Sequence, residues 1–453
     1  MQLKSYNNLK IQDLPSEVII SCLSFLKVED LQNCRLVSHQ FNNFIVNSPQ
    51  IMQNFKFNLQ FGIISTMAWI VNGLSGKDNL IKYYEDLHDL WRFVRDNGKS
   101  IRCVEVILTK NDKFKWFFLK HLPNLECLII NGVPMEVPGA ITSFFTTSND
   151  LSKLTTLKIN LSLLNSFMSS TKNVNKLEKL TVYITSIDDQ ELLTNFIKQQ
   201  KNLKVLSIKC DRNLTSINFP SSDITSKVKF QLTQFKLYQQ DIRNQSEHFL
   251  KFIESQAIHL ESLSFDFNPD EQLYKVIMTK CRNLKNLEFQ TDDEELFINL
   301  DPNWTLPSLR AIACAAVNSR RLDSITARFP NVNKLICRTI ENIDKGTYDK
   351  ITDIKADYMD GTQIDVLAYP NLKSLCLETF TGSVENWMKL TENLENLSIL
   401  IVKFRNGTDF DLKHLDHMRK LKSVNFKGQQ LDCANLRKSY CYGEPIIKIR
   451  KLL

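Results

Sequence analysis

The chain has 453 residues, 43% of them apolar, which is enough for an extensive core and makes disorder over most of its length unfavourable. Its net charge of +7 arises from 57 basic and 50 acidic residues mixed along the chain, a pattern typical of a solvated surface. The N-terminus has no apolar leader, no apolar tract is long enough for a membrane span, and the cysteine count of 11 is odd. We expect a cytoplasmic or nuclear protein without disulfides.

Residues 8–54 are predicted to form a small module of helices. Proline is tolerated in the first turn of a helix, so Leu14-Pro15 predicts a helix that begins near Ser16. Glu29 and Asp30 favour the start of a second helix, and Ser38 is expected to cap a third. Ser48-Pro49 should end the helical run, because the residue before proline avoids the α region. Apolar residues recur at helical spacing at Val18, Ile19, Cys22, Leu23, Leu26, Leu31, Cys34, Val37, Phe41 and Phe44.

This stretch resembles an F-box. The Leu-Pro step, the acid two positions on, Asp30-Leu31 and Phe41, where many F-boxes have Trp, fall where that family has them. The resemblance implies binding to a Skp-family adaptor, which joins a cullin, a RING protein and a ubiquitin-conjugating enzyme. It assigns to the adaptor contact or to the module core Leu14, Pro15, Ile19, Leu23, Leu26, Leu31, Val37 and Phe41. From size alone, a subdomain packed on its own chain stays an alternative.

Residues 55–97 are expected to connect this module to the rest of the chain. Phe55 to Phe61 alternate apolar and polar side chains with period two, which predicts a half-buried strand. Asn79–Asn97 has apolar residues on one side of a helical projection and predicts an amphipathic helix. Together the strand and the helix should cap the domain formed by residues 98–453.

From about Ile101 onward, a short motif of the form apolar-x-x-apolar-x-apolar recurs fourteen times. Its first residues are Ile101, Leu125, Leu154, Leu177, Leu203, Leu232, Leu260, Leu284, Leu309, Val332, Ile351, Leu372, Leu394 and Leu421. Stretches between these motifs, such as residues 188–197 and 269–278, open with acids and predict helices. The spacing, 19 to 29 residues between successive first positions, and the motif resemble leucine-rich repeats. This resemblance implies an α/β fold in which residues 98–453 form an irregular solenoid, with parallel strands on its concave face and helices on its convex face.

The strands of such a solenoid present alternate side chains to a partner. Tyrosine, lysine and arginine combine apolar area with a polar tip, which makes them suitable anchors. The substrate-binding candidates chosen on this basis are Tyr183, Lys209, Lys236, Tyr238 and Arg338. For any one of them, an ordinary solvated strand residue remains the more frequent outcome.

The sequence contains no convincing catalytic constellation. Gly73 to Lys77 looks like part of a phosphate-binding loop, but Val71 stands where that loop needs glycine. His414 and His417 lie three residues apart without a further ligand nearby, which favours a solvated pair over a metal site. We therefore expect a protein that is not an enzyme and that uses no cofactor or metal.

Three functions are compatible with this sequence. The first is the substrate-recognition subunit of an SCF-type ubiquitin ligase, in which the helical module binds the adaptor and the repeats bind a protein substrate. The second is a non-catalytic repeat scaffold that does not direct ubiquitination. The third is association with nucleic acid, which is motivated by the net charge alone and is disfavoured.

Overall fold

The computed structural model describes residues 14–26, 28–52, 55–60, 67–73, 79–84, 95, 98–107, 116–131, 149–186, 190–211, 229–239, 247–267, 269–289, 301, 303–341, 348–363, 369–391, 394–404, 420, 423–426 and 448–449. The chain clusters into two compact units, Met1–Gln231 and Leu232–Leu453, and each is described by itself. No helix in the described ranges is long and apolar enough to cross a membrane.

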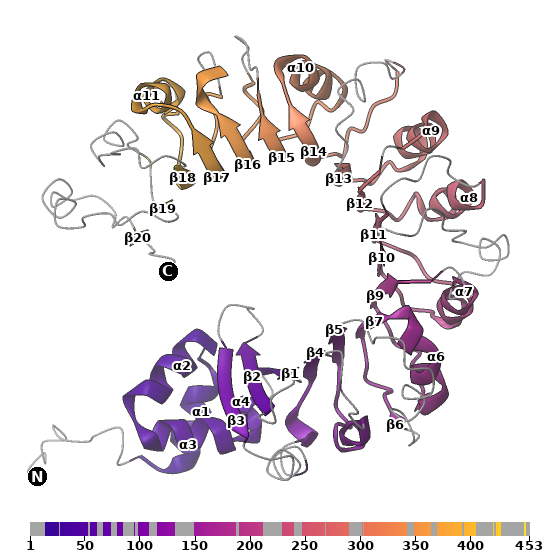
Figure 1. The fold of residues 1–453 in the computed structure, drawn as a ribbon, viewed down its shortest axis with the longest axis vertical. Helices are drawn as coiled ribbons and strands as arrows, with labels where there is room; N and C mark the ends of the chain where they lie inside the picture. The colour runs from indigo at the N-terminus through magenta and orange to yellow at the C-terminus, as the bar shows by residue number, and fades with distance from the viewer. Residues whose placement is uncertain are drawn as a thin grey trace, which may run out of the picture. The chain divides into compact units, whose positions relative to one another are not determined.

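Unit 1 begins with the three predicted helices, α1 (Ser16–Ser24), α2 (Val28–Val37) and α3 (His39–Asn47), and with a fourth, α4 (Pro49–Met52), that was not predicted (Figure 1). The predicted start near Ser16 is confirmed, because α1 follows directly on Pro15. Ser38 caps α3 as predicted, with its hydroxyl oxygen accepting a hydrogen bond from the backbone N–H of Gln40 at 3.1 Å. The predicted break at Ser48-Pro49 is confirmed for α3, which ends at Asn47 with Ser48 in an extended conformation, but the helical run does not stop there. A new short helix starts at Pro49, since proline suits the first position of a helix.

Three strands follow these helices. β1 (Phe55–Gln60) confirms the predicted strand, and it pairs antiparallel with β2 (Met67–Gly73), which in turn pairs antiparallel with β3 (Asn79–Tyr84). The helix predicted over Asn79–Asn97 is therefore wrong over Asn79–Tyr84, while residues 85–94 lie outside the described residues. Its apolar and aromatic residues fit a strand as well as a helix, and pairing with β2 decides between them.

The repeat strands of unit 1 start at the free edge of β1. β4 (Cys103–Ile107) pairs parallel with β1, and β5 (Cys127–Asn131), β7 (Thr156–Asn160), β9 (Lys179–Ile184) and β10 (Val205–Cys210) follow as parallel neighbours. Helices α6 (Leu161–Ser170) and α7 (Gln190–Gln199) connect the later strands, and the predicted helix at 188–197 is confirmed by α7. The smaller elements are η2 (Gly98–Ser100), η3 (Trp116–His121), and the strand pair β6 (Asn149–Asp150) and β8 (Thr171–Lys172).

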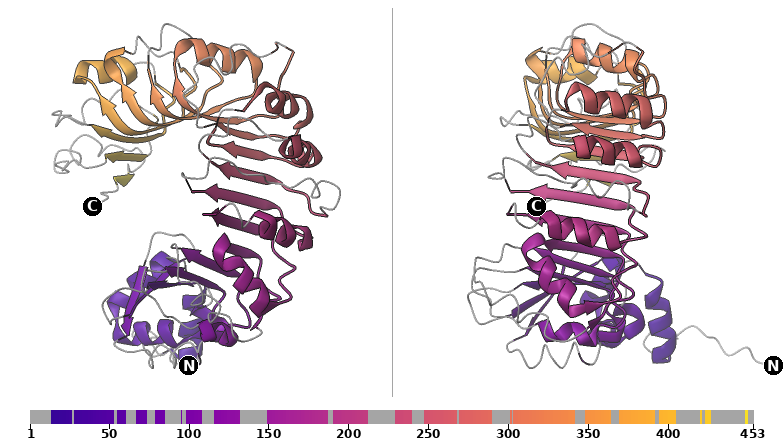
Figure 2. Two further views of the ribbon diagram at one scale, coloured as in Figure 1. Left: turned by 45° about the vertical axis from the view of Figure 1, so that its right-hand side comes forward. Right: turned by 90° about the vertical axis from the view of Figure 1, so that its right-hand side faces the viewer.

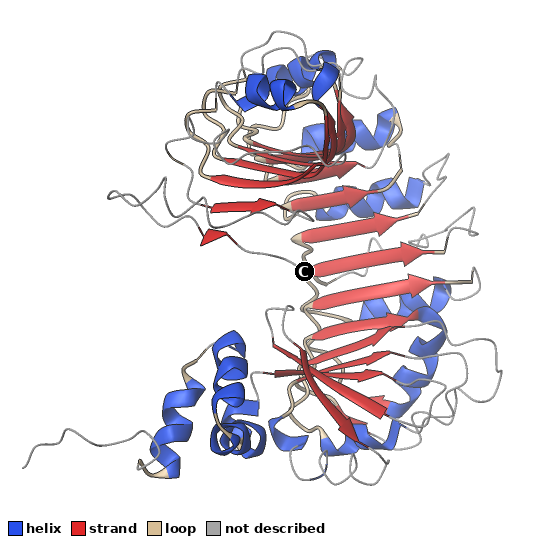
Figure 3. Ribbon diagram, turned by 60° about the vertical axis from the view of Figure 1, so that its left-hand side comes forward, coloured by secondary structure: helices blue, strands red, loops and turns tan. Residues whose placement is uncertain are grey.

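Unit 2 is a run of parallel strands in chain order. The strands are β11 (Gln234–Tyr238), β12 (Ser262–Phe265), β13 (Asn286–Phe289), β14 (Ala311–Val317), β15 (Lys334–Ile340), β16 (Asp353–Asp360), β17 (Ser374–Thr381), β18 (Ile399–Phe404), β19 (Ser423–Phe426) and β20 (Lys448–Ile449). The helices are α8 (Glu247–Gln256), α9 (Glu271–Lys280), α10 (Ser319–Arg328) and α11 (Val384–Thr391), with η5 (Gly361–Gln363) after β16. Within this unit the strands form one layer and these helices lie on one side of it (Figures 2 and 3).

Successive repeats stack through a recurring backbone contact. The carbonyl oxygen of Arg102 accepts the N–H groups of Glu126 and Cys127 at 2.7 and 2.9 Å. The same pattern recurs from repeat to repeat, and in unit 2 the carbonyl of Lys373 accepts from Ser398 and Ile399 at 2.9 and 3.0 Å. Each of the fourteen predicted units contains a strand, and the predicted α/β class with parallel strands is confirmed.

One predicted repeat has the wrong frame. The sequence places the motif at Leu394-Leu397-Ile399, but β18 pairs Leu400 with Leu375 and Val402 with Leu377 of β17. The core residues of this unit are therefore Leu397, Leu400 and Val402, three positions further on, and Ile399 is 42% exposed. The stretch Asn393-Leu394-Glu395-Asn396-Leu397 fits the motif in both frames, so the apolar pattern alone could not choose between them.

The core lies between the strand layer and the helices. Strands such as β5 and β11 alternate buried and half-buried side chains, as parallel strands with one packed face must. In unit 2 the core is aromatic around Phe265, whose ring stacks on Phe289 at 6.2 Å and 14° and meets Phe235 edge-on at 6.2 Å. Side-chain caps begin the helices behind these strands, with Asp270 accepting from Leu273 N–H at 2.8 Å at the start of α9. The predicted helix at 269–278 is thus confirmed.

Candidate functional site

The first candidate site is an exposed apolar stripe along α1. Leu14, Val18, Cys22 and Phe25 are spaced by four, four and three residues, so they follow one face of the helix. Leu14 is 37% exposed, Val18 42% and Phe25 86%, and Cys22 is also exposed. Among the residues whose side-chain exposure the structure describes, the only exposed large hydrophobic residues outside the helical module are Ile258 and Ile399. A module that displays this much apolar surface indicates a protein-binding face.

The opposite face of α1 builds the module core. Ile19 and Leu23 are 3% and 5% exposed, and α1 packs against α3 and α4. Leu31 of α2, Ile45 of α3 and Ile51 of α4 are fully buried in the same core. The face of α1 with Ile19 and Leu23 packs inside the module. The stripe Leu14-Val18-Cys22-Phe25 lies on the opposite face and stays exposed.

The structure separates the eight predicted adaptor residues into three groups by their burial. Ile19, Leu23 and Leu31 are core residues of the module. Leu14, Pro15, Leu26 and Val37 are exposed, the last at 75%, and Phe41 is half-buried. Sequence reasoning left Val18 and Phe25 out of the contact set. The four-residue steps from Leu14 to Cys22 could have indicated that Val18 belongs to the contact set. Phe25 lies just beyond the end of α1, and no pattern in the sequence indicates that it is exposed.

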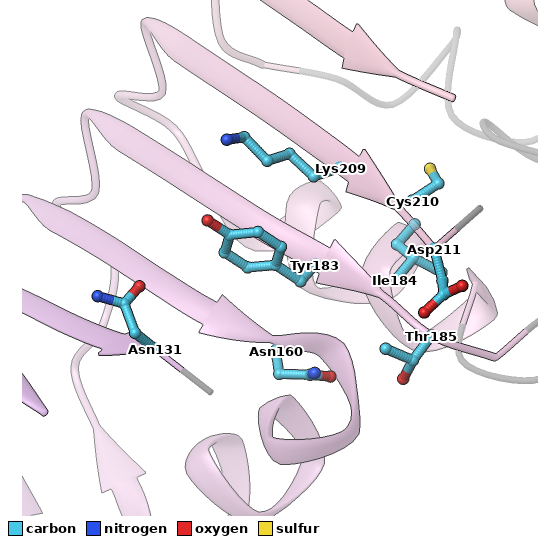
Figure 4. A pocket seen from close by; sticks show the side chains of 8 residues that line it. All are labelled: Asn131, Asn160, Tyr183, Ile184, Thr185, Lys209, Cys210 and Asp211. Carbon is cyan, nitrogen blue, oxygen red and sulfur yellow. The ribbon is translucent and has the colours of Figure 1, made fainter. Parts of the chain in front are cut away.

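The second candidate site lies on the side of the unit 1 strands that carries no helices, here named the open strand face. Tyr183 projects from β9 between neighbours on β7 and β10, where Asn160 and Lys209 stand in register with it (Figure 4). The ammonium groups of Lys158 and Lys209 lie 5.3 and 5.6 Å from the centroid of the Tyr183 ring. Both distances are within the range of cation–π attraction, so two positive charges are held around one aromatic ring.

A pocket of about 270 Å³ opens beside this ring. It sits at the carboxyl ends of β5, β7, β9 and β10, and Figure 4 shows its lining residues on these adjacent strands. The lining residues are Asn131, Asn160, Tyr183, Ile184, Thr185, Lys209, Cys210 and Asp211. Two of the five predicted substrate-binding residues, Tyr183 and Lys209, therefore meet at one pocket, and Lys158 is the neighbour that the prediction left out of the set.

The Asn160 side chain joins the pocket to helix α6. Its Oδ1 accepts hydrogen bonds from the backbone N–H and the hydroxyl of Ser162 at 3.1 and 2.9 Å, and this caps α6. Asn160 is only 2% exposed, although it follows the buried Ile159 and strand alternation would turn it to the solvated face. Capping explains its burial, and it leaves the amide nitrogen as the group that can face a ligand.

The other three predicted residues lie in unit 2. Lys236 and Tyr238 are half-buried neighbours on β11, two positions apart and so on the same side of the strand. Arg338 is exposed on β15, four strands further along, which corresponds to roughly 19 Å at about 4.8 Å per strand. The structure therefore does not bring Arg338 together with Lys236 and Tyr238.

Titratable groups in the described residues do not assemble into a metal site. No three of their His, Cys, Asp and Glu side chains are grouped so that they could hold a metal ion. Burial raises the pKa of the Cys281 thiol to about 12 and that of Cys314 to about 11, which keeps both thiols protonated and poorly nucleophilic. The histidine pair His414 and His417 lies outside the described residues.

The stacked strand and helix units of this chain are leucine-rich repeats preceded by a small helical module. The sequence model of the F-box domain family matches residues 11–50, which hold α1, α2 and α3. Residues 11–50 thus match the F-box domain family, and the residues that follow form the strand repeats. A comparison with curated protein sequences finds no match.

Several solved structures are similar to this chain at low identity. An internalin from Listeria monocytogenes is 14% identical with a TM-score of 0.33, over 79% of this chain and 92% of that one. The leucine-rich repeat protein LegL7 from Legionella pneumophila is 14% identical with a TM-score of 0.35, over 63% and 95%. A chain of the Rad7 and Elc1 complex in yeast is 11% identical with a TM-score of 0.35, over 80% and 87%. At such values no activity or partner of these proteins transfers to this chain.

Proposed function

We propose that this protein is the substrate-recognition subunit of an SCF-type ubiquitin ligase. In this role the F-box module binds a Skp-family adaptor, and through it a cullin and a RING protein, in the cytoplasm or the nucleus. The repeats bind a protein substrate. The chain makes and breaks no bonds itself, and it raises the local concentration of substrate lysines near the charged conjugating enzyme.

One observation carries the adaptor half of this proposal, namely the exposed apolar stripe on α1 inside the F-box match. Exposed apolar side chains near the centre of an interface contribute most of the binding free energy when a partner covers them. Phe25, at 86% exposed, would bury more new apolar surface in a complex than any other residue of the stripe.

The test is a pull-down of the co-expressed adaptor with Phe25→Asp and Val18→Asp variants. Both side chains are exposed, so the fold should tolerate the charge while an apolar interface should not. Asn43→Asp is the matched control, because Asn43 is an exposed residue of α3 and receives the same charge change. Adaptor binding should be lost in the first two variants and kept in the control. Equal adaptor recovery from all three would refute this interface.

A second experiment separates a ligase subunit from a scaffold that recruits the adaptor without ubiquitination. Proteins that bind the repeats would be added to the reconstituted ligase, with the Phe25→Asp variant as the uncoupled control. Ubiquitin transfer that depends on Phe25 supports the ligase role. A bound protein that stays unmodified in the complete assembly would favour the scaffold.

A further inference from the structure

Over β7, β9 and β10 the open strand face of unit 1 carries an excess of positive charge. Lys158 on β7, Lys179 on β9 and Lys209 on β10 lie on three adjacent strands, and none of these strands contains an acidic residue. In each strand the lysine alternates with the buried core residues. The three lysine side chains therefore lie on the same side of the strand layer, opposite the core. Neither Lys158 nor Lys179 has an ion-pair partner within the described residues.

The pocket adds shape to this charge. Tyr183 presents a ring between the Lys158 and Lys209 ammonium groups, and the buried Asn160 amide lines the same pocket with its nitrogen unused by α6. A carboxylate accepts hydrogen bonds from ammonium and amide groups alike, and it gains from both lysines at once. Asp211, an exposed residue at the far edge of the pocket, would repel a second carboxylate there and limit where the acid sits.

We propose that this face binds an acidic, extended peptide segment, with one carboxylate held between Lys158 and Lys209 beside Tyr183 and a small neighbouring side chain in the pocket. The inference rests on the proposed function in one respect, because the segment is taken to belong to a protein substrate. In an extended peptide alternate residues lie about 7 Å apart on one side, so acids at alternate positions can also reach Lys179.

Fluorescence anisotropy on the full-length chain tests the proposal. The probe is a fluorescein-labelled peptide of alternating Glu and Ala, and matched Gln-Ala and Lys-Ala peptides report on the contribution of charge. The Glu-Ala peptide should bind in preference to both, and binding should weaken as salt is raised. Equal binding of the Gln-Ala peptide, or no binding of the Glu-Ala peptide at millimolar concentration, overturns the proposal.

Variants locate the binding. The double change Lys158→Gln and Lys209→Gln should raise the Kd for the Glu-Ala peptide about tenfold, the effect of roughly 1.4 kcal/mol spread over two partly exposed ion pairs. Lys204→Gln is the control, because Lys204 pairs with Glu178 at 3.3 Å, outside the pocket lining. A double variant that binds the peptide like the unaltered chain overturns the assignment, and the urea midpoint of each protein shows that the fold is intact.

The same preparations separate this inference from the proposed function. Adaptor pull-down depends on α1, whereas peptide anisotropy depends on β7, β9 and β10. If the protein binds the Glu-Ala peptide through Lys158 and Lys209 but binds no adaptor, the ligase role is refuted and the peptide site is supported. If it binds the adaptor but not the peptide, the peptide site is refuted and the adaptor-binding role is supported.

Discussion

Asn396 donates a hydrogen bond from its Nδ2 to the backbone carbonyl oxygen of Pro370, 2.6 Å away, and this bond joins two successive repeats. Each asparagine of this kind directly precedes the first core residue of its motif, and each bonds to a carbonyl of the preceding repeat. The set, named here the asparagine ladder, consists of Asn124 with Lys99, Asn283 with Ile258, Asn331 with Pro307, Asn371 with Asp349, and Asn396 with Pro370.

The asparagine ladder links each of these repeats to the backbone of the repeat before it. It satisfies a carbonyl in each preceding turn, where an unpaired backbone group would cost free energy unless water reached it. Because Asn396 belongs to the ladder, the repeat it introduces starts at Leu397, in agreement with the pairing of β18.

Replacing Asn331 by alanine should remove one rung of the asparagine ladder. Its Nδ2 lies 2.8 Å from the Pro307 carbonyl oxygen, and we expect the loss to cost about 1 kcal/mol of unfolding free energy. Urea unfolding measures the change. Asn333→Ala is the control, because Asn333 is exposed two residues away and its side chain makes no hydrogen bond within the described residues. The two variants should differ in midpoint, and identical midpoints would show that the rung contributes nothing.

The strand motif is the part of this fold that the sequence predicts well. Leucines at fixed offsets carry their own period, so fourteen strands could be placed without knowing how they pair. The errors occur where the same residues fit two frames of the motif or two types of secondary structure. Leu394 and Leu397 offer two frames, and Asn79–Tyr84 satisfies both a helical and an extended pattern until its partner strand β2 is known.

The binding faces were predictable only in part. The F-box pattern locates α1, but apolar residues lie on both faces of this helix. The sequence alone therefore could not show that Ile19 is buried and Val18 exposed. Lys158 and Lys209 belong to different repeats, and only the register that places them on either side of Tyr183 makes them one site.

A phenylalanine-to-alanine substitution should lower the stability of the protein strongly in the phenylalanine core of unit 2 and hardly at all in the exposed stripe of α1. Phe265 is fully buried among Phe235, Phe267 and Phe289, so Phe265→Ala should cost about 4 kcal/mol. Phe25 is 86% exposed, and Phe25→Ala should change stability by less than about 0.5 kcal/mol.

Hydrogen exchange of peptides that cover β11 to β13 is the measurement, because it reports the opening of unit 2 locally. Exchange there should accelerate in Phe265→Ala and stay unchanged in Phe25→Ala. Unaltered exchange in Phe265→Ala would contradict a tightly packed aromatic core.

Leu14 and Leu23 should distinguish contact from support within the F-box module. Leu14 is 37% exposed, so Leu14→Ala should weaken adaptor binding while the module stays folded. Leu23 is 5% exposed, and Leu23→Ala should cost about 3 kcal/mol, enough to unfold a module of this size. Limited proteolysis between α1 and α4 separates the two effects, with cleavage expected in Leu23→Ala only. A Leu14→Ala protein that is cleaved equally fast would make Leu14 a core residue.

Exposed cysteine thiols should react with an alkylating reagent, whereas buried ones should not. Cys22 is exposed, whereas burial raises the pKa of Cys314 to about 11 and of Cys281 to about 12. Because the thiolate is the reactive species, iodoacetamide at mildly alkaline pH should modify Cys22 in the native protein and leave Cys281 and Cys314 intact. Mass spectrometry of the digested protein gives the extent of modification at each site, and Cys22→Ser is the control that removes its signal.

The same pKa shifts set the sign of a stability change at high pH. In the unfolded chain these thiols ionise near their ordinary pKa of 9.0, while the native thiol of Cys314 keeps its proton until about pH 11. The unfolded state therefore binds fewer protons than the native state in this window, and the free energy of unfolding falls as the pH rises through it. Urea midpoints measured across the window should decline less in a Cys314→Ala variant than in the unaltered chain. Equal declines would show that Cys314 is not the group that ionises on unfolding.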